Sequence, residues 1–289
     1  MLSFRTVTLE DRERLLPLLL QKDRGMEYTF SNIYVYRQIF DTKVAYHEEG
    51  AVILFGSRES VLMPLGHIDP ASLAGELPVA KDGAIRFACV TEKDTELLLK
   101  NFSDRNVTVI PQDDGEYVYR TRDLAELKGK KYHSKRNFCS RFERMYPDYS
   151  CEVIGPENLS EVAAMNEAWY AENAAVSDEL DGDRACTTGC LADYEKLGLR
   201  GALLRCSGKV VAWCCGEGGA EGVFFTHVEK ALRQAEGAYA VINRDFARML
   251  AGEYDYINRE DDAGDEGLRK AKMSYHPSGI VTKNTVVIR

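Results

Sequence analysis

The stretch from about residue 149 to the last residue alternates strand-like and helical segments in an order that constrains the fold. Tyr149–Ile154 has the period of a strand, Gly155 and Pro156 end it, and Glu157–Asn173 carries helical spacing. We expect a loop at 177–189 and a second helical stretch at 190–197. Later segments are three strand-like runs (GALLRCSG, KVVAWCCGEG, GVFFTHVEK), a helix at 238–250, a strand at 254–258, a short helix at 268–275 and a closing strand pair in IVTKNTVVIR.

This order is that of the GNAT acyltransferase fold, and the first half of the chain shows a looser version of it. At 289 residues the chain exceeds the usual size of one domain, roughly 100–200 residues. The polar, turn-rich segment PQDDGEYVYRTRDLAELKG separates the two parts. We therefore predict an α/β (α+β) protein of two tandem GNAT-like acyltransferase domains with mixed sheets, covering residues 1–122 and 123–289.

Positive charge gathers in one segment of an acidic chain. The protein has 37 basic and 46 acidic residues and a net charge of -9, which argues against general coating of nucleic acid. Residues 128–144, KGKKYHSKRNFCSRFER, nevertheless hold seven Lys or Arg and one acid. We predict one helix over Lys131–Met145, with Lys131, Lys135, Phe138, Phe142 and Met145 on a single stripe.

The aromatic end of that stripe should face the core, so the two lysines should line a cleft that binds an anion. The alternative is a solvated basic helix with lysines that reach into water. Arg136 lies at the edge of the stripe, and His133 and Asn137 complete the candidate set from this segment.

A second charged cluster lies in INREDDAGDEGLRKAKMSYHP, where acids precede bases. One interpretation is structural, because acids at a helix start and bases at its end complement the helix dipole. The other is functional, because a strand that runs into a glycine-flanked loop is where α/β proteins place ligands. The candidate anion-binding residues here are Asn258, Arg259, Glu260, Asp262 and Arg269.

The strand GVFFTHVEK and the loop after it offer further candidates. His227 and Glu229 share a face by period two, and either could act as general base; a strand-end Glu is as often a structural partner of Lys or Arg. Gln234 and Gly237 partly match a CoA-binding loop, Q/R-x-x-G-x-G/A, and are the candidate cofactor-binding residues. Tyr239 replaces the last small residue of that motif, which disfavours CoA.

Cysteine usage and hydropathy predict a cytoplasmic protein without a metal site. The eight Cys include no CxxC pair and no His at zinc-ligand spacing, so reduced, mostly buried thiols are expected. No apolar run approaches the roughly 18 residues of a membrane span, and no signal peptide is visible.

Four segments, in order, resemble the phosphatidylglycerol lysyltransferase C-terminal domain family: YRTRDLAELKGKKYHSKRNFCSRF, THVEKAL, EGAYAVINRDFA and INREDDAGDEGLRKAKMSYHP. The resemblance implies paired GNAT-like domains, similar to Fem-type peptidyltransferases. The best-known members move an aminoacyl group from aminoacyl-tRNA to a lipid hydroxyl and are fused to a membrane domain. It further implies that Lys272 matches a lysine of the Fem-type enzymes and that the KKYHSKRN helix belongs to the ligand cleft.

The leading hypothesis is a cytoplasmic acyltransferase that uses aminoacyl-tRNA, with tRNA as partner. Lys131, Lys135 and Arg136 would meet the donor's phosphates, Lys272 would steady the oxyanion, and Glu229 or His227 would relay the acceptor's proton. The alternatives are a CoA-dependent N-acetyltransferase and a non-catalytic module that binds an anionic metabolite or RNA. The sequence leaves open the acceptor, which could be a small molecule or a lipid headgroup, and the oligomeric state.

Overall fold

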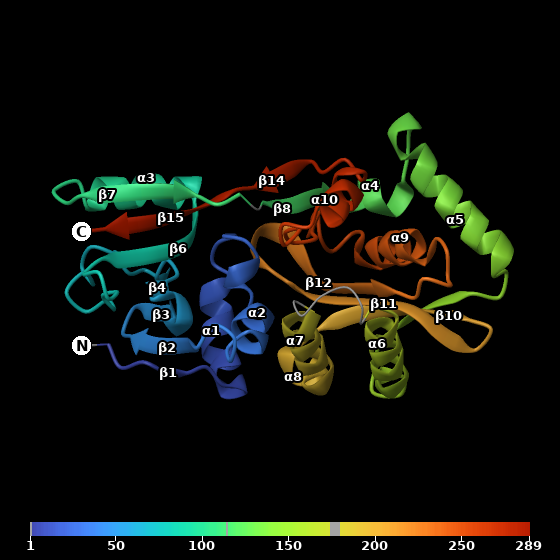
Figure 1. The fold of residues 1–289 in the computed structure, drawn as a ribbon, viewed down its shortest axis with the longest axis horizontal. Helices are drawn as coiled ribbons and strands as arrows, with labels where there is room; N and C mark the ends of the chain where they lie inside the picture. Colours follow the sequence, from blue (N-terminus) through green and yellow to red (C-terminus); the bar gives the residue numbers. More distant parts are fainter. Residues whose placement is uncertain (1, 114, 174–179) are drawn as a thin grey trace.

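The structure, a computed structural model, describes residues 2–113, 115–173 and 180–289. Its strands form two mixed sheets that lie side by side along the long axis of the molecule (Figure 1). The architecture is mixed α/β, as the order of the sequence segments predicts.

The first sheet has eight strands in the described part of the chain, in the order β1-β2-β3-β4-β6-β15-β7, with β5 beside β3. β3 and β4, on either side of Gly56, pair antiparallel. The strands of this sheet are β1 (Arg5–Thr6), β2 (Thr42–His47), β3 (Gly50–Phe55), β4 (Ser60–Val61), β5 (Leu65–Gly66), β6 (Ile85–Thr91), β7 (Val107–Pro111) and β15 (Lys283–Ile288).

The second sheet, within the same described residues, has seven strands in the order β14-β8-β13-β12-β11-β10-β9. All neighbours pair antiparallel except β12 and β13, which are parallel. Its strands are β8 (Glu116–Arg120), β9 (Ser150–Val153), β10 (Arg200–Cys206), β11 (Lys209–Gly218), β12 (Val223–Ala231), β13 (Tyr256–Asn258) and β14 (Gly279–Val281).

The chain crosses between the two sheets twice, once before β8 and once between β14 and β15. Residues 116–120 form β8 of the second sheet, and residues 283–288 return to the first sheet as β15, between β6 and β7. The expected closing pair is therefore wrong, because β14 and β15 belong to different sheets. The boundary at residue 122 stays a prediction.

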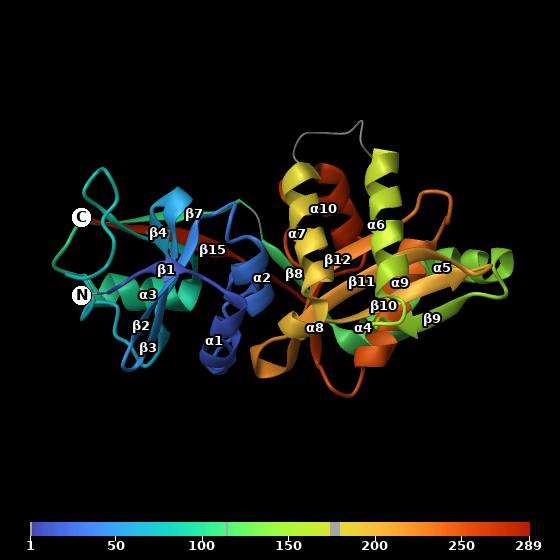
Figure 2. The same cartoon turned by 90° about the horizontal axis from the view of Figure 1, so that it is seen from below.

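Helices cover both faces of the second sheet. α6 (Leu159–Asn173), α7 (Leu180–Ala192) and α8 (Tyr194–Leu197) lie on one face, and α4 (Thr121–Glu126) and α9 (Ala238–Leu250) on the other (Figures 1 and 2). The first face shares one hydrophobic core with the first sheet and its helices, α1 (Arg12–Leu19), α2 (Phe30–Val35) and α3 (Glu92–Asn101). The remaining helices are α5 (His133–Met145) and α10 (Glu266–Met273).

Two helix predictions need correction. α7 occupies residues 180–189, where a loop was expected; residues 177–179 of that loop lie outside the described residues. Lys131 belongs to a 3-10 turn, Lys130–Tyr132, and the α-helix begins at His133. The eight cysteines form no disulfide, and seven of them are buried.

Candidate functional site

The candidate site lies where β12 and β13 diverge. The two strands pair only from Val223 to Phe225 of β12 and from Tyr256 to Asn258 of β13. Beyond that point β12 continues to Ala231, and no described strand pairs with its edge on that side. The backbone amides and carbonyls of this edge can therefore accept an extended ligand.

Arg259, the first residue after β13, extends into this gap. Its Nη2 donates to Oε1 of Glu229 at 2.8 Å, and its guanidinium lies 4.7 Å from the centre of the Tyr275 ring. Its Nη1 is buried and has no hydrogen-bond partner among the described residues. A buried guanidinium N–H without a partner is costly, so this atom is suited to bind an anionic ligand.

Lys135 of α5 is the second cation of the site. Its ammonium lies 3.8 Å from the centre of the Tyr275 ring, on which Arg259 also stacks, and it forms no ion pair with a described carboxylate. Burial lowers the pKa of Lys135 to about 8, and the like charge of Arg259 adds to the effect while Glu229 opposes it. An anion placed between Lys135 and Arg259 would offset the repulsion between the two positive charges.

Lys272 of α10 supports the loop that carries Arg259. Its ammonium is buried and donates to the carbonyl of Arg259 at 2.6 Å and to the carbonyl of Asp261. Burial, followed by the charge of Arg259, lowers the pKa of Lys272 to about 8. Two of its three N–H groups thus bind backbone carbonyls, and the third has no hydrogen-bond acceptor among the described residues.

Glu229 and His227 do not share a face. The β11–β12 register shifts opposite Cys215 and Gly216, which inserts His227 as an extra residue and breaks the alternation. Glu229 contacts Arg259 and, at 3.4 Å, the Nδ2 of Asn243 in α9. His227 instead contacts two carboxylates away from the gap, so only Glu229 is placed at the open edge of β12.

Of the basic segment 128–144, only Lys135 belongs to the candidate site. The buried side of α5 and its preceding turn consists of Tyr132, Cys139 and Phe142, whereas Phe138 and Met145 are 44% and 45% exposed. The stripe proposed from the sequence is therefore correct for Phe142, which is buried, and Lys135, which is half-buried, and wrong for Lys131, Phe138 and Met145, which are exposed. Lys131, His133 and Asn137 are exposed, with Lys131 at 3.6 Å from Asp123, and Arg136 donates to the carbonyls of Leu127 and Gly129.

Four residues of the second cluster shape the loop between β13 and α10. Asn258 is fully buried; its Nδ2 donates to Glu116 and its Oδ1 accepts the amide of Glu260. Asp262 accepts from the hydroxyl of Tyr117 at 2.6 Å and from Arg269 at 2.7 Å. Asn258, Glu260, Asp262 and Arg269 thus hold the loop in place and do not point into the gap.

The helix α5 covers the loop expected to bind CoA. Gly237 has a φ of +92°, and a Cβ there would lie 2.9 Å from the carbonyl oxygen of Phe138 in α5. Gln234 is exposed, and Glu236 forms an ion pair with Arg141 of α5. The N-terminus of α9 therefore faces a helix and a carboxylate, which is unfavourable for a pyrophosphate.

The sequence did not single out the aromatic floor of the site. The cations of Lys135 and Arg259 both lie over the ring of Tyr275. The ring of Tyr119 lies edge-on to that ring, with ring centres 6.4 Å apart. Both lie inside the quoted motifs, YRTRD and KMSYHP, but an isolated Tyr predicts no stacking partner without the fold.

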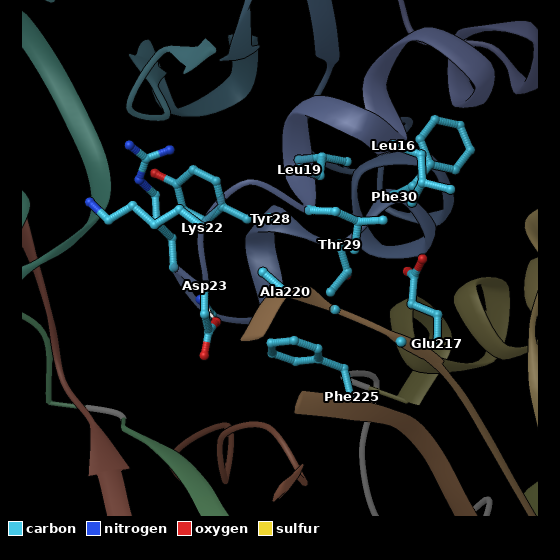
Figure 3. Close-up of a pocket in the computed structure, with 15 residues that line it drawn as sticks. Leu16, Leu19, Lys22, Asp23, Tyr28, Thr29, Phe30, Glu217, Ala220 and Phe225 are labelled. Atoms are coloured by element: carbon cyan, nitrogen blue, oxygen red, sulfur yellow. Dashed lines mark hydrogen bonds between the residues drawn. The ribbon is translucent and has the colours of Figure 1, made fainter. Parts of the chain in front are cut away.

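A separate, small hollow lies between the α1–α2 region and the turn from β11 to β12 (Figure 3). Leu16, Leu19, Phe30, Ala220 and Phe225 line it, and the carboxylate of Glu217 lies at one end. None of the site residues predicted from the sequence lines this hollow. Among the described residues, no helix combines the length and the apolar character that crossing a bilayer requires.

Solved structures show the same fold. A conserved protein of unknown function from Bacteroides thetaiotaomicron VPI-5482 is 32% identical, with a TM-score of 0.92 over 100% of both chains. L-PGS from Bacillus licheniformis is 17% identical, with a TM-score of 0.64 over 96% of this chain and 92% of that one. FemX, at 8% identity, has a TM-score of 0.56 over 99% and 96% of the two chains.

These similarities agree with the predicted tandem GNAT-like arrangement, and the fold class is confirmed. No curated protein sequence matches the chain. The family model for the C-terminal part of phosphatidylglycerol lysyltransferase matches residues 20–285. The chain therefore belongs to the phosphatidylglycerol lysyltransferase C-terminal domain family.

Proposed function

We propose that this acyltransferase-like protein transfers an aminoacyl group from aminoacyl-tRNA to a hydroxyl or amine acceptor. The family and the fold indicate an aminoacyl-transferase-like or GNAT-like acyltransferase. The observation that carries the finer assignment is a pair of cations beside the open edge of β12. Arg259 keeps a buried Nη1 without a partner among the described residues, and Lys135 forms no ion pair with a described carboxylate.

In the proposed reaction the phosphate next to the 3′ end of the tRNA binds between Lys135 and Arg259. The aminoacyl ester then lies along β12, near Glu229. The acceptor's O–H or N–H attacks the ester carbonyl, Glu229 takes the acceptor's proton, and the ribose oxygen leaves and receives that proton. The third N–H of Lys272 is the group assigned to the oxyanion.

A CoA-dependent N-acetyltransferase is the second candidate, and α5 weighs against it. CoA needs a free helix N-terminus for its pyrophosphate, whereas the N-terminus of α9 packs against Phe138 and faces Glu236. The hydroxyl of Tyr239 also accepts from Trp169 at 3.1 Å, which fixes this bulky side chain beside the loop.

The test is a pair of equilibrium titrations of the full chain, with uncharged tRNA and with CoA, in one buffer of fixed salt. We expect tRNA to bind at least tenfold more tightly than CoA. Tight CoA binding without tRNA binding would replace the proposal by the acetyltransferase. Binding of tRNA without any loss of label from aminoacyl-tRNA in the presence of amine and hydroxyl acceptors would favour the non-catalytic module.

A further inference from the structure

His227 is a buried imidazole with a carboxylate at each ring nitrogen. Its side chain is 3% exposed, its Nδ1 lies 2.7 Å from Oε1 of Glu260, and its Nε2 lies 3.2 Å from Oε1 of Glu217. A neutral imidazole carries one N–H and would turn a lone pair toward the other carboxylate. An imidazolium donates to both, so the geometry fits the charged form.

The pKa agrees with this geometry. Burial by itself lowers the pKa of His227, but Glu260 and Glu217 outweigh that effect and raise it to about 10. The histidine is therefore a fixed positive charge near neutral pH and a poor general base.

Both carboxylates also bind the first turn of α2. This helix packs with the first sheet, whereas the carboxylates belong to the second. Oε1 of Glu217 accepts the amide N–H of Ser31 at 2.7 Å, and Oε1 of Glu260 accepts Nδ2 of Asn32 at 2.9 Å. His227 thus connects β11, β12, the loop after β13 and α2. Without its charge, two buried carboxylates would face one another.

Glu260 couples this contact to the candidate site. Its φ of 58° is in the left-handed region, where a non-glycine residue persists only when its surroundings hold it. Glu260 directly follows Arg259, whose side chain points into the gap beside Glu229. The contact that fixes Glu260 therefore also fixes the direction of Arg259.

We infer that His227 is a positioning residue: its two carboxylate contacts join α2 to the loop 259–262 and thereby hold Arg259 in the anion site. The assignment of Arg259 to an anion rests on the proposed function, whereas the mechanical coupling of α2 to the loop does not. His227 therefore acts on donor binding through Arg259 and takes no proton from the acceptor.

The coupling is tested by amide hydrogen exchange on the full chain and on the His227→Gln variant. We expect exchange at residues 259–263 and 30–35 to rise at least tenfold in the variant, and exchange in β10 to stay unchanged. Lys135→Met removes a cation from the anion site and does not alter the contacts of His227. Amide exchange of both segments in this variant should equal that of the unsubstituted protein. Unchanged exchange in both segments of His227→Gln would overturn the inference.

Two further variants guard against simple misfolding. Asn32→Ala removes the side chain of α2 that binds Glu260 and leaves the amide of Ser31 on Glu217. It should raise exchange at 259–263, although Asn32 lies in another element. Glu260→Gln combined with His227→Gln removes one carboxylate together with the cation, so protection of 259–263 should partly return. A double variant no better protected than His227→Gln alone would mean that the side chain only fills space.

Titration with tRNA separates the two proposals. If the unsubstituted protein binds tRNA, His227→Gln should weaken binding about tenfold, and equal binding by the two would refute the link from His227 to Arg259. If the unsubstituted protein does not bind tRNA, the proposed donor is wrong, while the exchange measurements still decide whether His227 couples α2 to the loop.

Discussion

Arg259 and Glu229 form an ion pair of 2.8 Å across the gap between the diverging strands β13 and β12. The guanidinium uses one edge for this contact and leaves Nη1 buried without a described partner. A structural pair of this kind would normally satisfy the guanidinium more fully, since unpaired buried donors are expensive. The incomplete pairing is the reason to place a ligand here, and it leads to separate predictions for the two cations and the carboxylate.

Replacing Lys135 by Met should weaken tRNA binding about tenfold, because a charge-assisted contact to phosphate is worth roughly 1.5–3 kcal/mol. Arg141→Met is the matched control on the same helix, since Arg141 is 56% exposed and paired with Glu236. Its effect should stay within twofold. Fluorescence anisotropy with labelled tRNA at one salt concentration measures both, and equal losses would return α5 to the role of a solvated basic helix.

Replacing Glu229 by Gln should slow aminoacyl transfer by about 10²–10⁴, the range of a general base. Binding of tRNA should change much less, because Lys135 and the backbone edge of β12 remain. Single-turnover loss of label from aminoacyl-tRNA, with acceptor in excess, gives the rate. A variant that keeps full rate would exclude Glu229 as the base.

The fold could be predicted from the sequence largely because most segments between Tyr149 and Asn258 show the period of a strand or a helix; residues 180–189 of α7 are the exception. The β10, β11 and β12 runs, with glycines between them, predict adjacent antiparallel strands, and the structure confirms them. What the local pattern could not predict is the path of the last strands. Nothing within IVTKNTVVIR distinguishes β14, in the second sheet, from β15, which enters the middle of the first.

The candidate site was predictable in part. Glu229, Arg259 and Lys135 were named from charge placed next to a strand end or on a helix, and Lys272 was named from the resemblance to the Fem-type enzymes. His227 was misread, because a period of two assumes a regular strand and the inserted residue in β12 appears only in the register with β11. Lys131 was misplaced because it lies in the 3-10 turn before α5, where the 100° per residue of an α-helix does not apply.

Replacing Lys272 by Met should destabilise the protein, because the buried carbonyls of Arg259 and Asp261 lose their donor. An unsatisfied buried polar group costs about 1–3 kcal/mol, so the loss should exceed 1 kcal/mol. Lys270→Met, on the same helix and 79% exposed, should change stability by less than about 0.5 kcal/mol. Urea denaturation followed by circular dichroism compares the two. Equal stability of both variants would show that Lys272 does not hold the loop.

The stabilising effect of His227 should depend on pH in a defined direction. Glu260 and Glu217, against the opposing effect of burial, raise the pKa from 6.5 to about 10. Its contribution is then fully present below pH 6.5 and is lost as the pH rises through 10. The difference in unfolding free energy between the unsubstituted protein and His227→Gln should shrink steadily over that window. A difference that grows with pH would mean that the folded histidine is neutral.

Replacing Lys283 by Met should cost about 3–5 kcal/mol, since it removes one partner of a buried ion cluster. Lys283 is 4% exposed in β15 of the first sheet and contacts both Glu27 and Glu116, the latter in β8 of the second sheet. Burial raises the pKa of Glu116 to about 7, against the pull of Lys283, so losing that lysine should favour its protonated form further. Combining Lys283→Met with Glu116→Gln removes one of the two carboxylates that the lysine had paired and should restore part of the loss. The measurement is urea denaturation of the single and double variants at pH 7.5. A double variant as unstable as the single one would mean that Lys283 matters for packing in β15 and not for the charge that joins the two sheets.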